Sequence, residues 1–192
     1  MVRRPIECPD SSCEVHVIDF DQLHNYPELF QVSDVFCCLG TTIKKAKSKE
    51  AFRKVDYEYP IETAKLASQS DVEKFLIITA MGANANSSIF YNQVKGQVEK
   101  ALAKLPLPSV HIFRPSLLLG ERKEFRFGEK IAEKASAFLN VLMVGPLRPY
   151  KAIEARNVAA AMAAAAVIGK SGMNIYPSHV IERMARENIN IS

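Results

Sequence analysis

Short apolar runs alternate with longer amphipathic stretches along the chain. The runs are Glu14–Asp19, Asp34–Leu39, Lys74–Ala80 and Ser109–Arg114, with Ile175–Tyr176 as a last short one. The first alternates apolar and polar residues and is rich in β-branched side chains, which indicates a strand. The next three are almost continuously apolar, as parallel strands are when both faces of the sheet are covered. The pattern therefore predicts a parallel sheet of short, buried strands.

The amphipathic stretches between these runs are predicted to be helices. The longest covers 48–70, begins at the capping residue Ser48 and is interrupted by Pro60, which lacks the amide hydrogen of a helix interior. Further helices are expected over 21–30, 91–104, 128–140, 157–169 and 178–187, with Asp21, Asn157 and Ser178 as caps. Strands alternating with helices predict an α/β fold, a Rossmann-like doubly wound parallel sheet in one domain over residues 1–192.

The composition is that of a soluble globular protein. Apolar residues make up 48% and charged residues 24% of the 192 residues, which suits a sizeable core. The net charge of +4 is small and dispersed, so it favours a phosphorylated ligand rather than nucleic acid. The longest apolar stretch, 158–168, is too short to span a bilayer. We expect neither a nucleic-acid nor a membrane partner.

The four cysteines, Cys8, Cys13, Cys37 and Cys38, have a spacing that suits no zinc site. We expect them to be buried thiols in a reducing compartment, because free cysteine is one of the most buried residue types. No secretory signal sequence is visible at the start of the chain. These features lead us to expect a cytoplasmic protein.

The stretch from Thr79 to Lys95 carries the candidate chemistry. Tyr91 and Lys95 stand four positions apart at the start of a predicted helix, so both side chains project from one face. A nearby cation favours a phenolate, and a tyrosine so placed can exchange a proton with a substrate oxygen. Thr79 ends the preceding strand and can hydrogen-bond the same oxygen. On its own, the pair is more often a surface tyrosine beside a solvated lysine than a catalytic pair.

Three stretches that flank this motif, taken together with it, resemble a known family of proteins. They are FCCLGTT (36–42), ITAMGAN (78–84) and FRPSLLLGERKEFR (113–126), and Tyr91-Asn92-Gln93-Val94-Lys95 matches a Tyr-x-x-x-Lys motif. In that order the chain resembles the atypical short-chain dehydrogenases/reductases of the Tat-interacting oxidoreductase type, from Arg3 to about Ala165. The resemblance implies an NADP-dependent oxidoreductase. It would transfer a hydride to or from a small carbonyl or alcohol substrate.

The resemblance also assigns roles to single residues. Tyr91 would be the general acid/base, Lys95 would support it and hold the nicotinamide ribose, and Thr79 would position the substrate oxygen. NADP would be bound by residues that follow the ends of the strands. These are Arg3 and Arg4 for the extra phosphate, Asp19 and Phe20 for the adenine, Leu39, Gly40 and Thr41 for the ribose and diphosphate, Leu118 for the nicotinamide, and Arg126 for the phosphates.

The chain departs from the family pattern in two places. Asp56 stands where many relatives have a helix Asn that supports the lysine through a water, which places that relay in doubt. The Gly-rich phosphate loop of such folds is also missing, because none of the eight glycines forms it near the N-terminus. We expect Met1 to be internal to a longer protein, or else the chain to be a truncated product. The first strand and helix would then be absent and these 192 residues inactive.

A second class of function fits the same residues. Several atypical relatives look like NADPH-binding sensors or scaffolds that act through partner proteins rather than through turnover. The fold does not decide between the two classes. The presence of both Tyr91 and Lys95 favours the enzyme, since a sensor has less need of them. Either kind of protein is compatible with a homo-oligomer or a partner protein.

Overall fold

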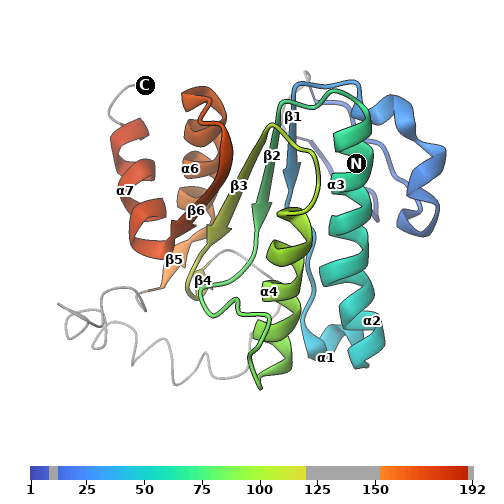
Figure 1. Ribbon diagram of the computed structural model, residues 1–192, viewed down its shortest axis with the longest axis horizontal. Helices are drawn as coiled ribbons and strands as arrows, with labels where there is room; N and C mark the ends of the chain where they lie inside the picture. Colours follow the sequence, from blue (N-terminus) through green and yellow to red (C-terminus); the bar gives the residue numbers. More distant parts are fainter. Residues whose placement is uncertain (9–12, 120–151, 190–192) are drawn as a thin grey trace.

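The computed structural model describes residues 1–8, 13–119 and 152–189. Its centre is a four-stranded parallel sheet in the order β1-β2-β3-β6 (Figure 1). The strands are β1 (Asp34–Cys37), β2 (Lys74–Ile78), β3 (Ser109–Arg114) and β6 (Gly172–Pro177). A separate two-stranded parallel sheet joins β4 (Leu118–Leu119) to β5 (Ile153–Glu154). The continuously apolar runs and the last short run are therefore strands, as predicted.

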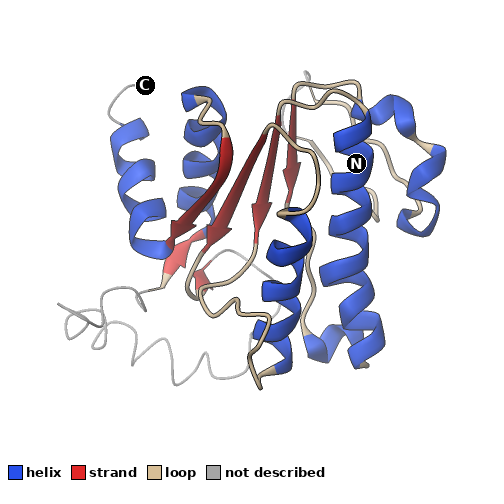
Figure 2. Cartoon of the chain, viewed as in Figure 1, coloured by secondary structure: helices blue, strands red, loops and turns tan. Residues whose placement is uncertain are grey.

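Helices cover both faces of the central sheet, as Figures 1 and 2 show. On one side lie α3 (Tyr59–Gln69) and α4 (Phe90–Leu102), and on the other α6 (Ala155–Ile168) and α7 (Ser178–Ile189). This arrangement confirms the doubly wound α/β fold. Within the described ranges, no helix is both long and apolar enough to cross a membrane.

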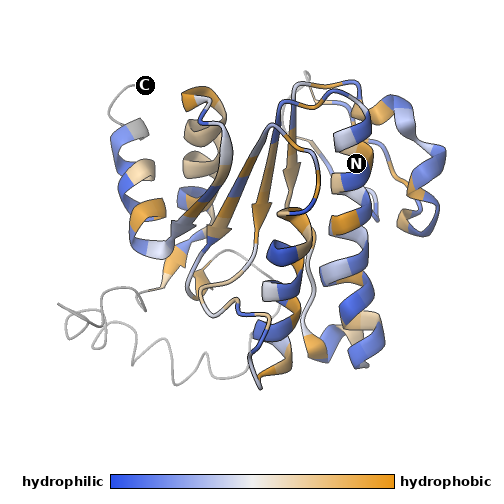
Figure 3. Cartoon of the chain, viewed as in Figure 1, coloured by the Kyte–Doolittle hydropathy of each residue, from blue (hydrophilic) through white to orange (hydrophobic). Residues whose placement is uncertain are grey.

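The two cores follow from the alternation of side chains along the strands. On β2, Phe75 and Ile77 join the core beneath α3 and α4, whereas Leu76 joins the core beneath α6. On β3, Ile112 and Phe113 divide in the same way. β1 and β2 are drawn largely in the orange of apolar residues in Figure 3. Burial on both faces is the physical reason for the apolar sequences of β2 and β3.

The helix predicted over 48–70 forms, with one irregular turn. It comprises α2 (Lys49–Arg53), the π-helical η3 (Lys54–Glu58) and α3. Ser48 caps it as predicted, since its hydroxyl accepts a hydrogen bond from the Ala51 amide. At the π turn the Tyr59 amide donates to the Lys54 carbonyl, and Pro60 follows at the second position of α3. A wider turn thus absorbs a residue that cannot donate the usual helix hydrogen bond.

Several predicted boundaries differ from the structure. Residues 14–19 form only an isolated parallel bridge between Val17 and Val2, because no further strand lies beside them in the described chain. The caps are shifted: Asp19 rather than Asp21 caps the 3₁₀ helix η1 (Phe20–Asn25), which η2 (Pro27–Phe30) follows. Helix α6 starts directly after β5, with Glu154 rather than Asn157 at its cap. The helix predicted over 128–140 lies outside the described residues.

The cysteines behave differently from one another. Cys8 and Cys13 form a disulfide, so the expectation of free, buried thiols is wrong for this pair. Cys38 is free but exposed, and it too departs from the expectation. Cys37, on β1, is a buried thiol as predicted, and burial raises its pKa to about 12. It is therefore protonated and unreactive at neutral pH.

Candidate active site

Helix α4 presents three polar side chains on one face. Tyr91, Lys95 and Glu99 are spaced four residues apart, so they line up along the helix. Tyr91 lies in the first turn, half buried, with its ring 5.7 Å from the ring of Phe52. Lys95 and Glu99 are buried. Because buried charges require partners, the two charged groups define what surrounds the tyrosine.

Lys95 is paired directly with Asp56. The Lys95 Nζ lies 2.7 Å from Asp56 Oδ1, and the side chains are only 6% and 1% exposed. The π turn η3 carries Asp56 to this position from the neighbouring helix. Burial raises the pKa of Asp56, while the Lys95 ammonium opposes that shift. Asp56, which replaces the helix Asn of many relatives, therefore holds the lysine through a direct ion pair and without an intervening water.

The predicted cofactor loop rests on this ion pair. The Thr41 amide donates a 2.8 Å hydrogen bond to Asp56 Oδ2, the oxygen that Lys95 does not contact. A Cβ placed on Gly40 would lie 3.4 Å from Asp56 Oδ1 and 3.9 Å from Lys95 Nζ. The structure thus brings together Gly40, Thr41 and Lys95, which the sequence placed in one site. Short α1 (Ile43–Ala46) follows the loop, capped by Thr42.

Thr79 is buried, and its hydroxyl already has a partner within the protein. It is 4% exposed, at the carboxyl end of β2, and its hydroxyl donates to Glu99 Oε1 at 2.7 Å. Arg114, the last residue of β3, binds the same carboxylate through Nε at 3.0 Å and through a terminal nitrogen at 2.5 Å. The hydrogen bond to Glu99 raises the pKa of Arg114. Sequence reasoning missed Glu99 and Arg114, although Glu99 shares the helix face of Tyr91.

The N-terminal residues form a second group. The Val2–Val17 bridge holds the start of the chain against the segment that leads into η1, and Arg3 and Arg4 are exposed. The Arg3 guanidinium lies 5.9 Å from the centre of the Tyr59 ring. Asp19 is exposed and accepts the Asp21 amide at the start of η1. The cofactor contacts expected of Arg3, Arg4 and Asp19 stay a prediction.

The remaining predicted cofactor residues are more apolar. Phe20 is buried in the core, with its ring 5.5 Å from that of Tyr59. Leu39 is partly buried against the same core. Leu118, on β4, packs against the other core. Arg126 lies outside the described residues.

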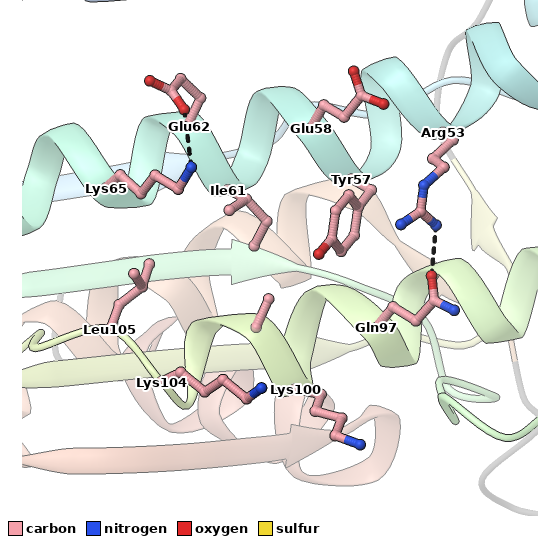
Figure 4. A pocket seen from close by; sticks show the side chains of 11 residues that line it. Arg53, Tyr57, Glu58, Ile61, Glu62, Lys65, Gln97, Lys100, Lys104 and Leu105 are labelled. Atoms are coloured by element: carbon pink, nitrogen blue, oxygen red, sulfur yellow. Dashed lines mark hydrogen bonds and ion pairs between the residues drawn. The ribbon is translucent and has the colours of Figure 1, made fainter.

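A groove of about 630 Å³ lies elsewhere, between η3–α3 and α4 (Figure 4). Basic side chains line much of it, including Lys65, Lys100 and Lys104. Arg53 crosses it to reach Gln97 Oε1 at 2.5 Å. None of Thr79, Tyr91 and Lys95 lines this groove. It is therefore distinct from the candidate active site.

Comparison with solved structures defines the class of protein. The chain superimposes on MoeE5 bound to UDP-glucose and NAD with a TM-score of 0.65 and 14% identity, over 96% of this chain and 71% of that one. WbmG from Bordetella bronchiseptica, bound to NAD, gives a TM-score of 0.60 at 13% identity, over 96% and 64%. At such identities the likeness concerns the fold. With the Tyr91–Lys95 motif, it identifies an atypical short-chain dehydrogenase/reductase-like protein with an NAD(P)-binding fold.

Sequence comparison gives the particular family. The chain belongs to the HIM1 family, which matches residues 11–145. Protein HTATIP2 of Rattus norvegicus is 42% identical over 119 residues, or 62% of this chain and 49% of that protein. Protein FMP52, mitochondrial, of Candida albicans is 32% identical over 166 residues, or 83% and 72%. The chain thus spans about half the length of the rat relative.

The fungal relatives correct one expectation. FMP52 of Candida albicans and FMP52-1 of Scheffersomyces stipitis are both named as mitochondrial proteins. The second is 36% identical over 143 residues and is covered to 59% of its length. The expectation of a cytoplasmic protein, drawn from the thiols and the start of the chain, is therefore contradicted.

Proposed function

We propose that the protein is an NADP-dependent oxidoreductase acting on a small carbonyl or alcohol substrate. The observation that carries the proposal is the convergence of two segments at one buried ion pair. The Gly40–Thr41 loop and Lys95 both contact Asp56. Lys95 lies one helical turn after Tyr91 on α4. A backbone loop that can approach a ligand thus lies beside Lys95, which shares a helix face with the candidate proton donor Tyr91. The combination suits cofactor binding next to acid–base chemistry.

The residues present fit a dinucleotide in part. Lys95 has N–H donors beyond the one directed at Asp56, which suits a ribose hydroxyl. When bound, the nicotinamide supplies or accepts the hydride. Tyr91 would give a proton to the substrate oxygen or take one from it through its phenolic oxygen. Asp56 holds Lys95 in position, on the face of α4 that also carries Tyr91. A Gly-rich loop for the diphosphate does not occur in the sequence.

The test of this function is the loss of turnover in Tyr91→Phe. In protein shown by titration to bind NADPH, a panel of carbonyl compounds would be assayed for NADPH oxidation. We expect a fall of ~10²–10⁴-fold, the usual value of general acid–base catalysis. Tyr57→Phe is the matched control, because that tyrosine lines the separate α3–α4 groove. If Tyr91→Phe turns over as fast as the control, the role of Tyr91 is refuted.

The choice of NADP rests on Arg3 and Arg4. Guanidinium groups bind phosphate oxygens in a forked geometry, and both side chains are exposed. Replacing both with Ala should weaken binding of NADPH and leave binding of NADH unchanged. Changing Lys100 and Lys104 to Ala removes the same charge from the α3–α4 groove and serves as the control. An equal loss of affinity for NADPH and NADH would show that the arginines do not bind the 2′-phosphate.

A binding protein without turnover is the second candidate. One observation favours it: both charged side chains of the α4 face are already engaged, Lys95 by Asp56 and Glu99 by Arg114. Thr79 is likewise engaged, by Glu99. Such a site can hold a cofactor while acting through a partner protein. Tight NADPH binding together with no oxidation of NADPH by any carbonyl compound would support this candidate over the enzyme.

A further inference from the structure

The α3–α4 groove lies outside the candidate active site and has the size of a small-molecule site. Its volume of about 630 Å³ falls within the range of pockets that bind drug-sized ligands. Its apolar lining, the apolar strip, consists of Ile61, Ala101 and Leu105. Its charged lining has four cations and two acids: Arg53, Lys65, Lys100 and Lys104, with Glu58 and Glu62. The groove therefore combines an excess of positive charge with an apolar surface.

Arg53 is held in place by two neighbours that carry no charge. Its guanidinium lies 4.2 Å from the centre of the Tyr57 ring, and one terminal nitrogen donates to Gln97 Oε1 at 2.5 Å (Figure 4). These contacts orient the guanidinium without neutralising it. Its remaining N–H groups can still donate, and a guanidinium binds a carboxylate through two parallel hydrogen bonds. Arg53 is therefore a prepared anchor for a carboxylate.

Lys100 and Lys104, the lysine pair, form a second cationic point. Lys100 lies in the last turn of α4, and Lys104 lies in the turn that follows, where its amide donates to the Ala101 carbonyl. Both side chains are exposed, and neither forms an ion pair with another residue that the structure describes. Gln97, which holds Arg53, precedes the two lysines by roughly 5 and 10 Å along the helix axis. The groove thus has two separate cationic points.

The charges that are free in the groove match a dianion. Lys65 is already paired with Glu62 at 3.4 Å. With that pair set aside, three cations (Arg53 and the lysine pair) stand against one acid (Glu58), which leaves a net charge of +2. In Figure 4 the Arg53 side chain reaches toward α4, whereas the Glu58 carboxylate points away from it. A phosphate group carries its charge at one point, but these cations lie at two.

We propose that the α3–α4 groove binds a dicarboxylate whose two carboxylates are separated by a short chain of methylene groups. Arg53 holds one carboxylate, and the lysine pair holds the other. The methylene groups lie on the apolar strip, where Ile61 is only 8% exposed and its two neighbours are partly buried. None of the candidate catalytic residues lines the groove, so the inference goes beyond the proposed function and does not depend on it.

Adipate and hexanoate are suitable probes, because they have the same carbon chain and differ by one carboxylate. Each would be titrated at constant ionic strength into protein carrying ¹³C-labelled isoleucine methyl groups, and the Ile61 signal followed by NMR. We expect adipate to bind roughly three- to tenfold more tightly than hexanoate, as one or two further exposed ion pairs allow. Inorganic phosphate, whose charge lies at one point, should bind less tightly than adipate.

The double substitution Lys100→Gln and Lys104→Gln is the central comparison. It should remove the advantage of adipate and leave the affinity for hexanoate nearly unchanged. Arg53→Lys, which keeps the charge without the fork, should weaken both ligands. Lys170→Gln removes an exposed charge outside the groove and should keep the wild-type ratio.

Glu58→Gln should have the opposite effect from the cation substitutions. It removes an acid from the lining, so adipate should bind more tightly, a gain that a damaged fold would not produce. Equal binding of adipate and hexanoate by the wild type would overturn the proposal. So would an Ile61 signal that responds to neither ligand, or an advantage of adipate that survives the double lysine substitution.

Discussion

Asp56 and Lys95 are 39 positions apart in sequence, and their ion pair joins η3 to α4. Both side chains are almost fully buried, so neither is easily reached by water. A buried ion pair is costly to break from one side, because the remaining charge has no substitute partner. Asp56 also holds the Thr41 amide. One carboxylate therefore stabilises the cofactor loop and the lysine together.

Asp56→Asn tests this double contact. The amide keeps the size of the side chain but removes the charge opposite Lys95. We expect the free energy of unfolding to fall by about 1–3 kcal/mol, measured by urea denaturation, because a buried donor loses its charged acceptor. The control is Glu62→Gln, whose exposed partner Lys65 lies 3.4 Å away. That change should cost less than about 1 kcal/mol. Equal effects of the two substitutions would contradict a special role for Asp56.

His111 is fully buried on β3, with a hydrogen-bond partner at each ring nitrogen. The Ser109 hydroxyl donates to the Lys170 carbonyl, so its oxygen accepts from His111 Nε2 at 2.8 Å. In the neutral imidazole, Nδ1 then accepts from the Tyr176 hydroxyl at 2.9 Å.

The pH dependence of stability should report this neutral state. Burial, and secondarily Lys74, lowers the pKa of His111 below its ordinary value of about 6.5. Below that value the unfolded chain binds a proton that the folded chain refuses, so stability falls as pH drops. We expect urea denaturation to show a loss of up to about 1.4 kcal/mol per pH unit from this residue between the two pKa values.

His111→Gln should remove that part of the slope, whereas replacement of the exposed His24 with Gln should preserve it. A slope unchanged by His111→Gln would show that another group is responsible.

Among the elements, α4 depends most closely on a loop. The backbone of Asn84 and Ala85 passes directly against Gly96, and a Cβ there would lie 2.1 Å from the Ala85 nitrogen. The loop also donates from the Asn84 amide to the Asn92 carbonyl at 3.0 Å. Glycine is required at this position because backbone, rather than a flexible side chain, occupies the space. The contact sets the distance between the loop after β2 and the helix of Tyr91.

Gly96→Ala should therefore destabilise the protein, although alanine is the better helix former. The gain in helix propensity is about 1 kcal/mol. Displacing backbone typically costs 1–3 kcal/mol or more, so we expect a net loss in urea denaturation. Gly40→Ala is the control, because its Cβ would meet atoms no nearer than 3.4 Å. If Gly96→Ala is as stable as the wild type, the loop does not pack as described.

The elements that have a local sequence pattern were predictable, and the elements that depend on contacts with other parts of the chain were not. The runs that became β2 and β3 are apolar because both faces of the sheet are covered there. The run that became β1 is covered on one face only, since Val35 and Cys37 join the core and Phe36 is 46% exposed. Residues 14–19 are rich in β-branched side chains but form a single bridge, because a strand needs a partner that no local pattern supplies. Pro60 signalled an irregular helix without revealing that the adjustment is a π turn.

The candidate site divides along the same line. Tyr91 and Lys95 were recognisable because their spacing on one helix is local. The pairing of Lys95 with Asp56, and of Glu99 with Arg114, depends on how helices and strands pack. Reasoning from the sequence flagged Asp56 only as a departure from a pattern. It missed Arg114, which is simply the last residue of a strand until the fold places it beside α4.

For the whole molecule, the principal prediction concerns the cofactor's diphosphate. In this fold its charge is met by a Gly-rich loop and the start of a helix, and the 192 residues contain no such loop. Titration with NADPH should therefore give at least roughly tenfold weaker binding than the same chain fused upstream to a βα unit with a Gly-rich loop. Tenfold corresponds to about 1.4 kcal/mol. Equal, tight binding by the unfused chain would refute the prediction.

The edge position of β1 has a consequence for dynamics. Like β6 at the other edge, it is hydrogen-bonded on one side only among the described strands, to β2, and its Phe36 is 46% exposed. A strand held on one side can detach alone more readily than a strand enclosed on both sides. Amide hydrogen exchange should accordingly be faster in β1 than in β2 and β3. The Gly40–Thr41 loop follows β1, so each opening of that strand would briefly separate the loop from Asp56.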